Sequence, residues 1–345
     1  MKTDRSASMT AGMTVFSVLY ASTVIGTPLY RNGHTLFRFL VTAAVLLVYA
    51  PLCFRFFTAR ETCPKKGVTR VASVVFAAAA VCVGACSAAR FASPLGTFAP
   101  YYGTWQVRLA AGLLVVLIAL YAAYHGRYAV TGFASVIAWV FPLWTGMGLF
   151  AFLATKTAVL PSPPLAGADR KLLADALTET LPLLADVTAA ALLLTANGTM
   201  SKKNVHFADG GVIAFLVLGA VNVLKNLLLL GEAFAAKTNV PNLAAIRLVP
   251  LLELPELAVI VGMAAAVVHT AVYVCAAYEL LQKVFDKKKS MIAFTAVLAV
   301  TTALAVMTDF QQTSGMTAAV LSLFASYASR LDGKRQKQTE KSDTV

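Results

Sequence analysis

The chain has 345 residues, of which 59% are hydrophobic and 13% charged, whereas a soluble domain usually carries about 25% charged residues. This composition, with a mean hydropathy of +0.73, excludes an ordinary soluble protein and predicts several membrane spans. The net charge of +13 does not indicate nucleic-acid binding, because lysine and arginine collect in the cytoplasmic loops of membrane proteins.

Ten apolar stretches, separated by polar or proline-containing segments, are candidates for membrane-spanning helices. The sixth stretch is short and the tenth is weakly bounded. In chain order they cover residues 9–29, 36–56, 68–90, 105–124, 131–153, 181–194, 211–230, 257–281, 291–307 and 315–327.

The distribution of basic residues favours ten spans with both termini in the cytoplasm. With the N-terminus inside, about two thirds of the 29 lysines and arginines fall on inner segments, as the positive-inside rule requires. The clearest inner segment follows the eighth span and contains Lys283, Lys287, Lys288 and Lys289. Residues 331–345 are charged and almost without apolar side chains, which predicts a disordered basic cytoplasmic tail.

The longest outer connection contains a Pro-Ser-Pro-Pro sequence at residues 161–164, followed by an expected short amphipathic helix at residues 168–180. It divides a single transmembrane domain, residues 1–330, into two halves of five spans, residues 9–157 and 168–330. Because five is an odd number, the two halves enter the membrane in opposite senses. The sequence therefore predicts an all-α polytopic membrane protein built as two inverted repeats, an arrangement typical of secondary transporters.

Polar residues gather at the end of the first span. In inverted-repeat transporters the substrate binds near the bilayer midplane, where the first helix of each half is interrupted. Ser22, Thr23, Gly26, Thr27 and Pro28 form the densest polar and helix-weakening cluster in the first span. They predict an unwound segment whose backbone amides meet a substrate carboxylate. The alternative is an ordinary helix end, since Pro28 lies near the boundary.

Polar residues also occur within the sixth, seventh and eighth spans. Asp186 is an acid in an apolar helix, where it could bind an amine, take up a proton or coordinate a cation; the alternative is an acid at the outer boundary. Thr188 adds a neighbouring hydroxyl. His269 and Tyr273 share one helix face at i, i+4 spacing, either as ligand or proton-relay groups or as packing residues. Lys225 either extends to the interface or pairs with an acid such as Asp186.

The sequence predicts no enzyme active site. Its four histidines include no pair at zinc spacing, and we find no phosphate-binding glycine loop and no Ser-His-Asp group on one aqueous face. We therefore expect no enzymatic activity, no metal, no cofactor and no nucleic-acid partner.

Three stretches are similar to motifs of one known family. They are residues 117–130 with Phe133 and Phe141-Pro142 after them, residues 239–247 leading to residues 254–257 and Tyr273, and Asp186 followed by Lys202 and Lys203 in an order of ten spans. In these features the chain resembles the spore germination permease family, the B subunits of GerA-type nutrient germinant receptors, within the amino acid–polyamine–organocation (APC) superfamily.

The resemblance implies a LeuT/APC-like fold with broken first and sixth helices and a small-molecule site between them. It implies a permease-like B subunit that binds a small nutrient, an amino acid first of all, and triggers germination together with A- and C-type subunits. Its location would be the cell membrane, specifically the spore inner membrane. Two alternatives stay open: a cation- or proton-coupled amino acid transporter, and a membrane scaffold subunit that binds partners but no ligand.

Overall fold

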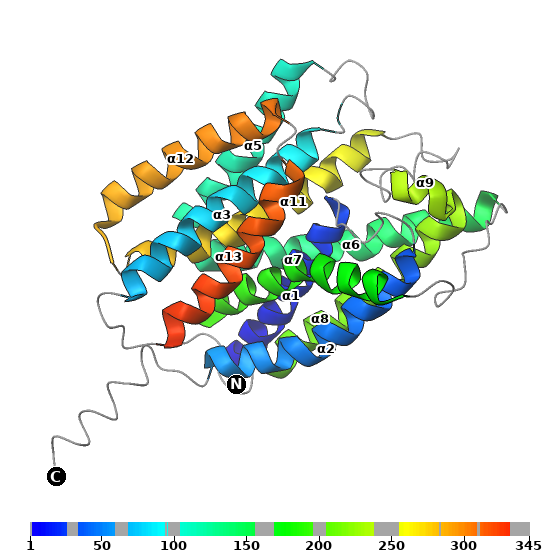
Figure 1. Ribbon diagram of the computed structural model, residues 1–345, viewed down its shortest axis with the longest axis horizontal. Helices are drawn as coiled ribbons and strands as arrows, with labels where there is room; N and C mark the ends of the chain where they lie inside the picture. Colours follow the sequence, from blue (N-terminus) through cyan, green and yellow to red (C-terminus); the bar gives the residue numbers. More distant parts are fainter. Residues whose placement is uncertain are drawn as a thin grey trace, which may run out of the picture.

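The computed structural model describes residues 2–25, 34–58, 68–93, 95, 104–155, 169–195, 205–237, 255–282, 284–308 and 311–331. Within these ranges the regular secondary structure is helical (Figure 1). The helices are α1 (Lys2–Val24), α2 (Thr35–Thr58), α3 (Val68–Ala92), α5 (Trp105–Tyr124), α6 (Arg127–Thr155), α7 (Arg170–Thr195), α8 (Val205–Leu230), α9 (Glu232–Lys237), α11 (Pro255–Gln282), α12 (Lys287–Met307) and α13 (Gln311–Leu331). The predicted tail lies outside the described residues, apart from Leu331.

Seven of the described helices, namely α2, α3, α5, α6, α7, α8 and α11, are long and apolar enough to cross a membrane. Shorter apolar segments occupy Ser8–Val24 in α1, Met291–Met307 in α12 and Thr317–Ser329 in α13. Each of the ten predicted stretches thus coincides with one of these ten helices. The prediction of a multi-pass helical membrane protein is confirmed, whereas membrane crossing by α1, α12 and α13 stays a prediction.

The outer faces of several helices carry large apolar side chains with no protein covering them. A soluble protein exposes such residues singly rather than along whole helices, whereas a bilayer surrounds them with hydrocarbon. On α2, α6 and α12 the exposed set is Leu47, Val48, Leu52, Val136, Trp139, Leu143, Val297, Val300 and Leu304. These apolar faces are suited to contact with lipid hydrocarbon.

The expectation for the sixth span was wrong in one respect. We expected a short amphipathic helix at residues 168–180 and a separate span at residues 181–194, but α7 is continuous from Arg170 to Thr195 with Pro182 inside it. Its polar first half stays helical because α2 provides partners: Arg38 pairs with Glu179, and the Thr42 and Thr180 hydroxyls lie 3.1 Å apart. The helix break that the family resemblance implies near Asp186 is therefore absent.

The first helix is likewise continuous from Lys2 to Val24. The residues at which we expected it to unwind, Gly26, Thr27 and Pro28, lie outside the described residues. Ser22 and Thr23 occupy its last turn.

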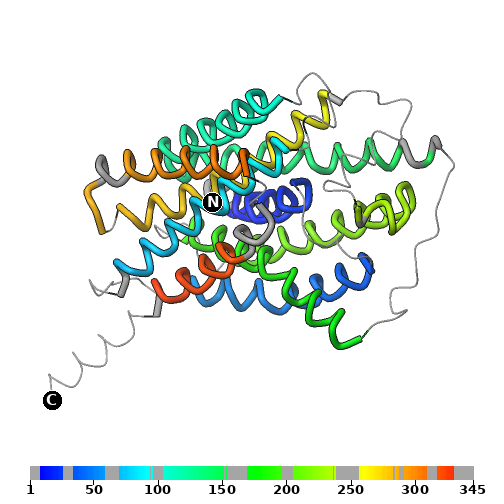
Figure 2. Tube along the Cα trace, turned by 45° about the horizontal axis from the view of Figure 1, so that its top comes forward, coloured from blue at the N-terminus to red at the C-terminus, as the bar shows by residue number. Residues whose placement is uncertain are grey.

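The helices pack around α1, which lies inside the bundle in both views (Figures 1 and 2). α1 contacts α6, α7, α8 and α11, and α3 contacts α5, α11, α12 and α13. Many contacts occur in matched pairs. The contacts of α1 with α6 and α8 match those of α7 with α13 and α2. The contacts of α3 with α12 and α13 match those of α11 with α5 and α6. The first half of the chain contains α1, α2, α3, α5 and α6, and the second half contains α7, α8, α11, α12 and α13. When each helix is replaced by the helix at the same place in the other half, every one of these contacts becomes its matched contact.

The contact between α1 and α8 is made backbone to backbone at two glycines. A Cβ atom on Gly211 would overlap the carbonyl oxygen of Gly12, and a Cβ atom on Gly12 would overlap the carbonyl oxygen of Phe207. In a bilayer, where lipid is as apolar as a side chain, such close approach supplies much of the attraction between helices.

We expect Gly211→Ala to lower the free energy of unfolding by about 1–3 kcal/mol, because the new methyl group meets rigid backbone atoms rather than a side chain that can turn away. Thermal unfolding of the purified protein in detergent measures the change. Gly210→Ala is the matched control, since nothing lies within 4 Å of a Cβ atom there. Equal melting temperatures for the two variants would contradict the close contact.

Candidate functional site

Asp186 lies in the most enclosed part of α7. All residues from 185 to 194 are buried, and Asp186 itself is 1% exposed. A helix that faces lipid exposes one side, so this stretch is surrounded by other helices. A carboxylate inside a membrane protein is tolerated when it faces the interior and finds hydrogen-bond donors there.

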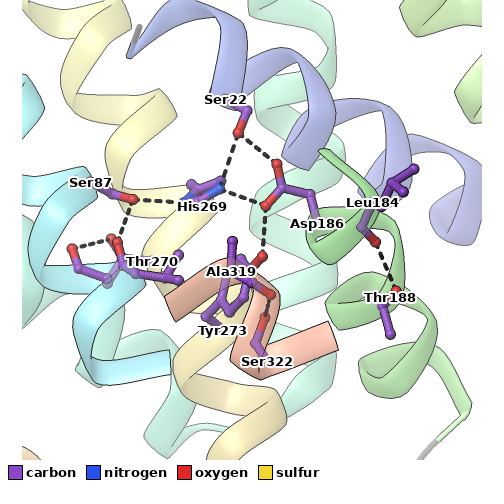
Figure 3. Close-up of polar contacts among 12 residues, drawn as sticks. Ser22, Ser87, Leu184, Asp186, Thr188, His269, Thr270, Tyr273, Ala319 and Ser322 are labelled. Atoms are coloured by element: carbon purple, nitrogen blue, oxygen red, sulfur yellow. Dashed lines mark hydrogen bonds and ion pairs between the residues drawn. The ribbon is translucent and has the colours of Figure 1, made fainter. Parts of the chain in front are cut away.

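Three side chains from two other helices contact this carboxylate (Figure 3). The Ser22 hydroxyl, on α1, donates to Oδ2 at 2.6 Å, and the Tyr273 hydroxyl, on α11, donates to Oδ1 at 2.8 Å. His269 Nε2, also on α11, lies 2.9 Å from Oδ1 and 3.3 Å from the Ser22 oxygen. All four side chains are buried. The carboxylate thus joins α1, α7 and α11.

The other side of the imidazole reaches a fourth helix. His269 Nδ1 lies 2.8 Å from the Ser87 hydroxyl oxygen on α3, and this hydroxyl also lies 2.8 Å from the carbonyl oxygen of Val83. Small residues make the approach of α11 to α3 possible: a Cβ atom on Gly84 would lie 3.0 Å from the Thr270 methyl carbon.

The Ser87 contacts allow two hydrogen-bond arrangements, because its hydroxyl has a single proton. When the Ser87 hydroxyl donates to the Val83 carbonyl oxygen, His269 Nδ1–H must donate to the Ser87 oxygen. A second proton then lies between His269 Nε2 and Asp186 Oδ1. When Ser87 donates to Nδ1, Nε2–H donates to an ionised Asp186. The two arrangements differ by one proton. Rotation of the Ser87 hydroxyl accommodates either arrangement without moving a helix.

Four of the predicted site residues, Ser22, Asp186, His269 and Tyr273, are brought together here. The i, i+4 spacing of His269 and Tyr273 places both on the face of α11 that meets α7, with ring centroids 5.2 Å apart. Thr23 is buried but donates to the Tyr20 carbonyl oxygen of its own helix at 2.7 Å. Gly26 and Thr27 lie outside the described residues.

Thr188 belongs to a different polar group. Its hydroxyl donates to the Leu184 carbonyl oxygen at 2.7 Å and lies 2.6 Å from the Tyr49 hydroxyl on α2. The Tyr327 hydroxyl of α13 in turn donates to Tyr49 at 3.1 Å. The structure thus places the Thr188 hydroxyl in a group other than that of the Asp186 carboxylate, because two residues along a helix turn a side chain through about 200°.

Reasoning from the sequence missed Ser87. It lies in an alanine-rich helix with no polar periodicity, so only its contact with His269 distinguishes it. Lys225, considered as a partner of Asp186, is absent from the contacts of that carboxylate. Among the described residues there is no group of three or more His, Cys, Asp or Glu side chains that could hold a metal ion.

Comparisons with known proteins add no relative: no protein-family model and no curated protein matches the chain. The fold and the site define a class, a multi-pass helical membrane protein with a buried Asp186–His269 pair at the meeting point of α1, α3, α7 and α11.

We expect a coupling free energy of about 1–3 kcal/mol between Asp186 and His269, because their contact is buried and each satisfies the other. Asp186→Asn, His269→Gln and the double variant form the cycle, measured by thermal or denaturant unfolding in detergent. Asp186→Asn combined with Ser135→Ala is the control, since Ser135 bonds only within α6, to the Thr131 carbonyl oxygen at 2.8 Å. Additive effects of Asp186→Asn and His269→Gln would contradict the contact.

Proposed function

We propose that this protein is a permease-like membrane protein that binds a small nutrient carrying an amine, an amino acid, at Asp186 between α1, α7 and α11. We propose further that it acts as the B subunit of a nutrient germinant receptor. The observation that carries the binding proposal is the buried Asp186 carboxylate, which receives its hydrogen bonds from two other helices.

The matched helix contacts support an inverted-repeat architecture. α1, α2, α3, α5 and α6 would correspond to α7, α8, α11, α12 and α13, with each half crossing the membrane five times. In such proteins the substrate site lies at the interface of the two repeats. Asp186 and Ser22 come from the first helices of the two halves, which is where a LeuT/APC-like fold would place a ligand. Both termini would then lie on the same side of the membrane, and the distribution of basic residues favours the cytoplasmic side.

The contacts of Asp186 indicate how a ligand would compete for it. His269 Nε2 occupies Oδ1, and a ligand ammonium would replace this contact while Ser22 and Tyr273 continue to donate. Because all four side chains are buried, the ligand can enter only when α1 or α11 moves away from α7. Ligand binding would thus favour one arrangement of these helices over another, and this differential affinity is what a receptor needs to signal.

The receptor assignment itself rests on the sequence resemblance. A germinant receptor B subunit would lie in the spore inner membrane with A- and C-type subunits. Copurification of those subunits with the tagged protein from spores tests the assignment, and their absence from a stable, ligand-responsive preparation would overturn it.

A second function is favoured by the single proton that separates the two Ser87–His269 arrangements. A proton-coupled amino acid transporter needs a group that binds or releases one proton as the substrate binds. Two hydrogen-bond arrangements that differ by one proton are compatible with that role at Asp186 and His269.

We expect millimolar concentrations of an amino acid to raise the melting temperature of the purified protein, because a ligand that binds only the folded state stabilises it. Asp186→Ala should abolish the increase. Asp175→Ala, which removes an acid from the first half of the same helix, should retain it. No increase with amino acids, nucleosides or sugars, in protein shown to be folded, would contradict nutrient binding and favour the scaffold alternative.

Reconstituted vesicles separate receptor from transporter. If the protein is a proton-coupled transporter, a pH gradient that is acidic outside should drive accumulation of the stabilising amino acid at least several-fold, since proton entry supplies the energy. His269→Gln should remove the dependence on the gradient. Binding without accumulation supports the receptor, and accumulation that ignores the gradient contradicts proton coupling.

A further inference from the structure

Lys225 on α8 is a buried amine outside the Asp186 site. Its side chain is 1% exposed, and its Nζ atom has no hydrogen-bond partner among the described residues. An isolated ammonium in a protein interior is strongly unfavourable. Lys225 lies five residues before the end of α8, about 7–8 Å along the axis, so a lysine at this position would ordinarily extend towards the interface.

Gly148 on α6 makes room for this ammonium. A Cβ atom on Gly148 would lie 3.0 Å from both Cδ and Nζ of Lys225. The lysine therefore points across the interface between α8 and α6, and a larger residue at position 148 would force its side chain to shift. The geometry holds Nζ between the two helices.

A second unsatisfied donor lies on the same face of α6. Trp144 is one turn before Gly148, so the two residues face the same way. Its side chain is 2% exposed, and Nε1 has no partner among the described residues. An indole N–H can only donate, and so can an ammonium. Buried polar groups are normally satisfied, so these two donors need an acceptor, and a negatively charged one would also neutralise the ammonium.

We propose that Lys225 and Trp144 bind a small, singly charged anion, a halide or a small carboxylate, between α6 and α8. The anion neutralises the ammonium and accepts hydrogen bonds from both groups. α1 packs against α6 as well as α8, so an anion that holds these two helices together also supports the helix that presents Ser22. The site does not depend on nutrient binding at Asp186.

Thermal unfolding of the full chain in detergent tests the site. Sodium gluconate, a bulky anion, is replaced stepwise by sodium chloride or by sodium acetate at constant ionic strength. We expect the melting temperature to rise by about 2–5 °C at saturation with at least one of the two. A response to chloride alone identifies a halide site, a response to acetate alone a carboxylate site, and a response to both a general anion site.

Variants of the two donors locate the response. Lys225→Met should abolish it while leaving the protein folded in gluconate, because methionine fills the same space without a charge. Trp144→Phe keeps the ring but not the N–H, and should raise the half-saturating anion concentration at least 3-fold. Lys237→Met and Trp105→Phe remove an exposed lysine and an exposed tryptophan and should leave the response unchanged.

Two results would overturn the proposal. One is a wild-type melting temperature that is the same in gluconate, chloride and acetate. The other is an equal rise in Lys225→Met and in the wild type. If Lys225→Met does not fold, Lys225→Gln takes its place: it removes the charge but keeps a polar side-chain end, so the anion response should fall, and an undiminished response overturns the proposal in the same way.

Discussion

The cost of burying the Asp186 carboxylate is the constraint on which the centre of this structure depends. A carboxylate on a lipid-facing helix would be expelled to the interface, so α7 must be enclosed where Asp186 occurs. Enclosure alone is insufficient, because the oxygens need donors. Ser22 and Tyr273 supply them, and His269 extends the network to Ser87. One charged group thereby fixes where four helices meet.

Close packing of small residues provides the rest of the attraction. Helices in a bilayer gain little from burying apolar side chains against one another, so backbone approach and interhelical hydrogen bonds matter more. Gly12 and Gly211 let α1 meet α8, Gly84 lets α3 meet α11, and Gly148 accommodates Lys225 between α6 and α8. Each glycine lies beside a helix that contributes to a polar site. The helix contacts that these glycines allow therefore also position the polar side chains of the two sites.

The two polar sites differ in whether their hydrogen-bonding groups have partners. At Asp186 the donors and acceptors satisfy one another, so a ligand must displace an existing partner and move a helix. At the second site the Lys225 and Trp144 donors have no hydrogen-bond partner among the described residues, so an anion could bind them without displacing an existing partner. We therefore expect a nutrient to rearrange the helices around Asp186, and an anion to stabilise the packing of α6 against α8.

Apolar length and composition were enough to predict the helical membrane class and ten helical stretches, each of which overlaps one of the long helices. An apolar run about 20 residues long has few alternatives to a membrane helix. The i, i+4 spacing of His269 and Tyr273 also predicted their shared face.

The tertiary structure alone decided that residues 170–195 form one helix, since Arg38 and Thr42 on α2 satisfy its polar half. It alone separated Thr188 from Asp186, added Ser87 to the site and left Lys225 facing Gly148. These outcomes depend on which helix lies opposite each residue, and a hydrogen-bond partner distant along the chain leaves no local pattern in the sequence.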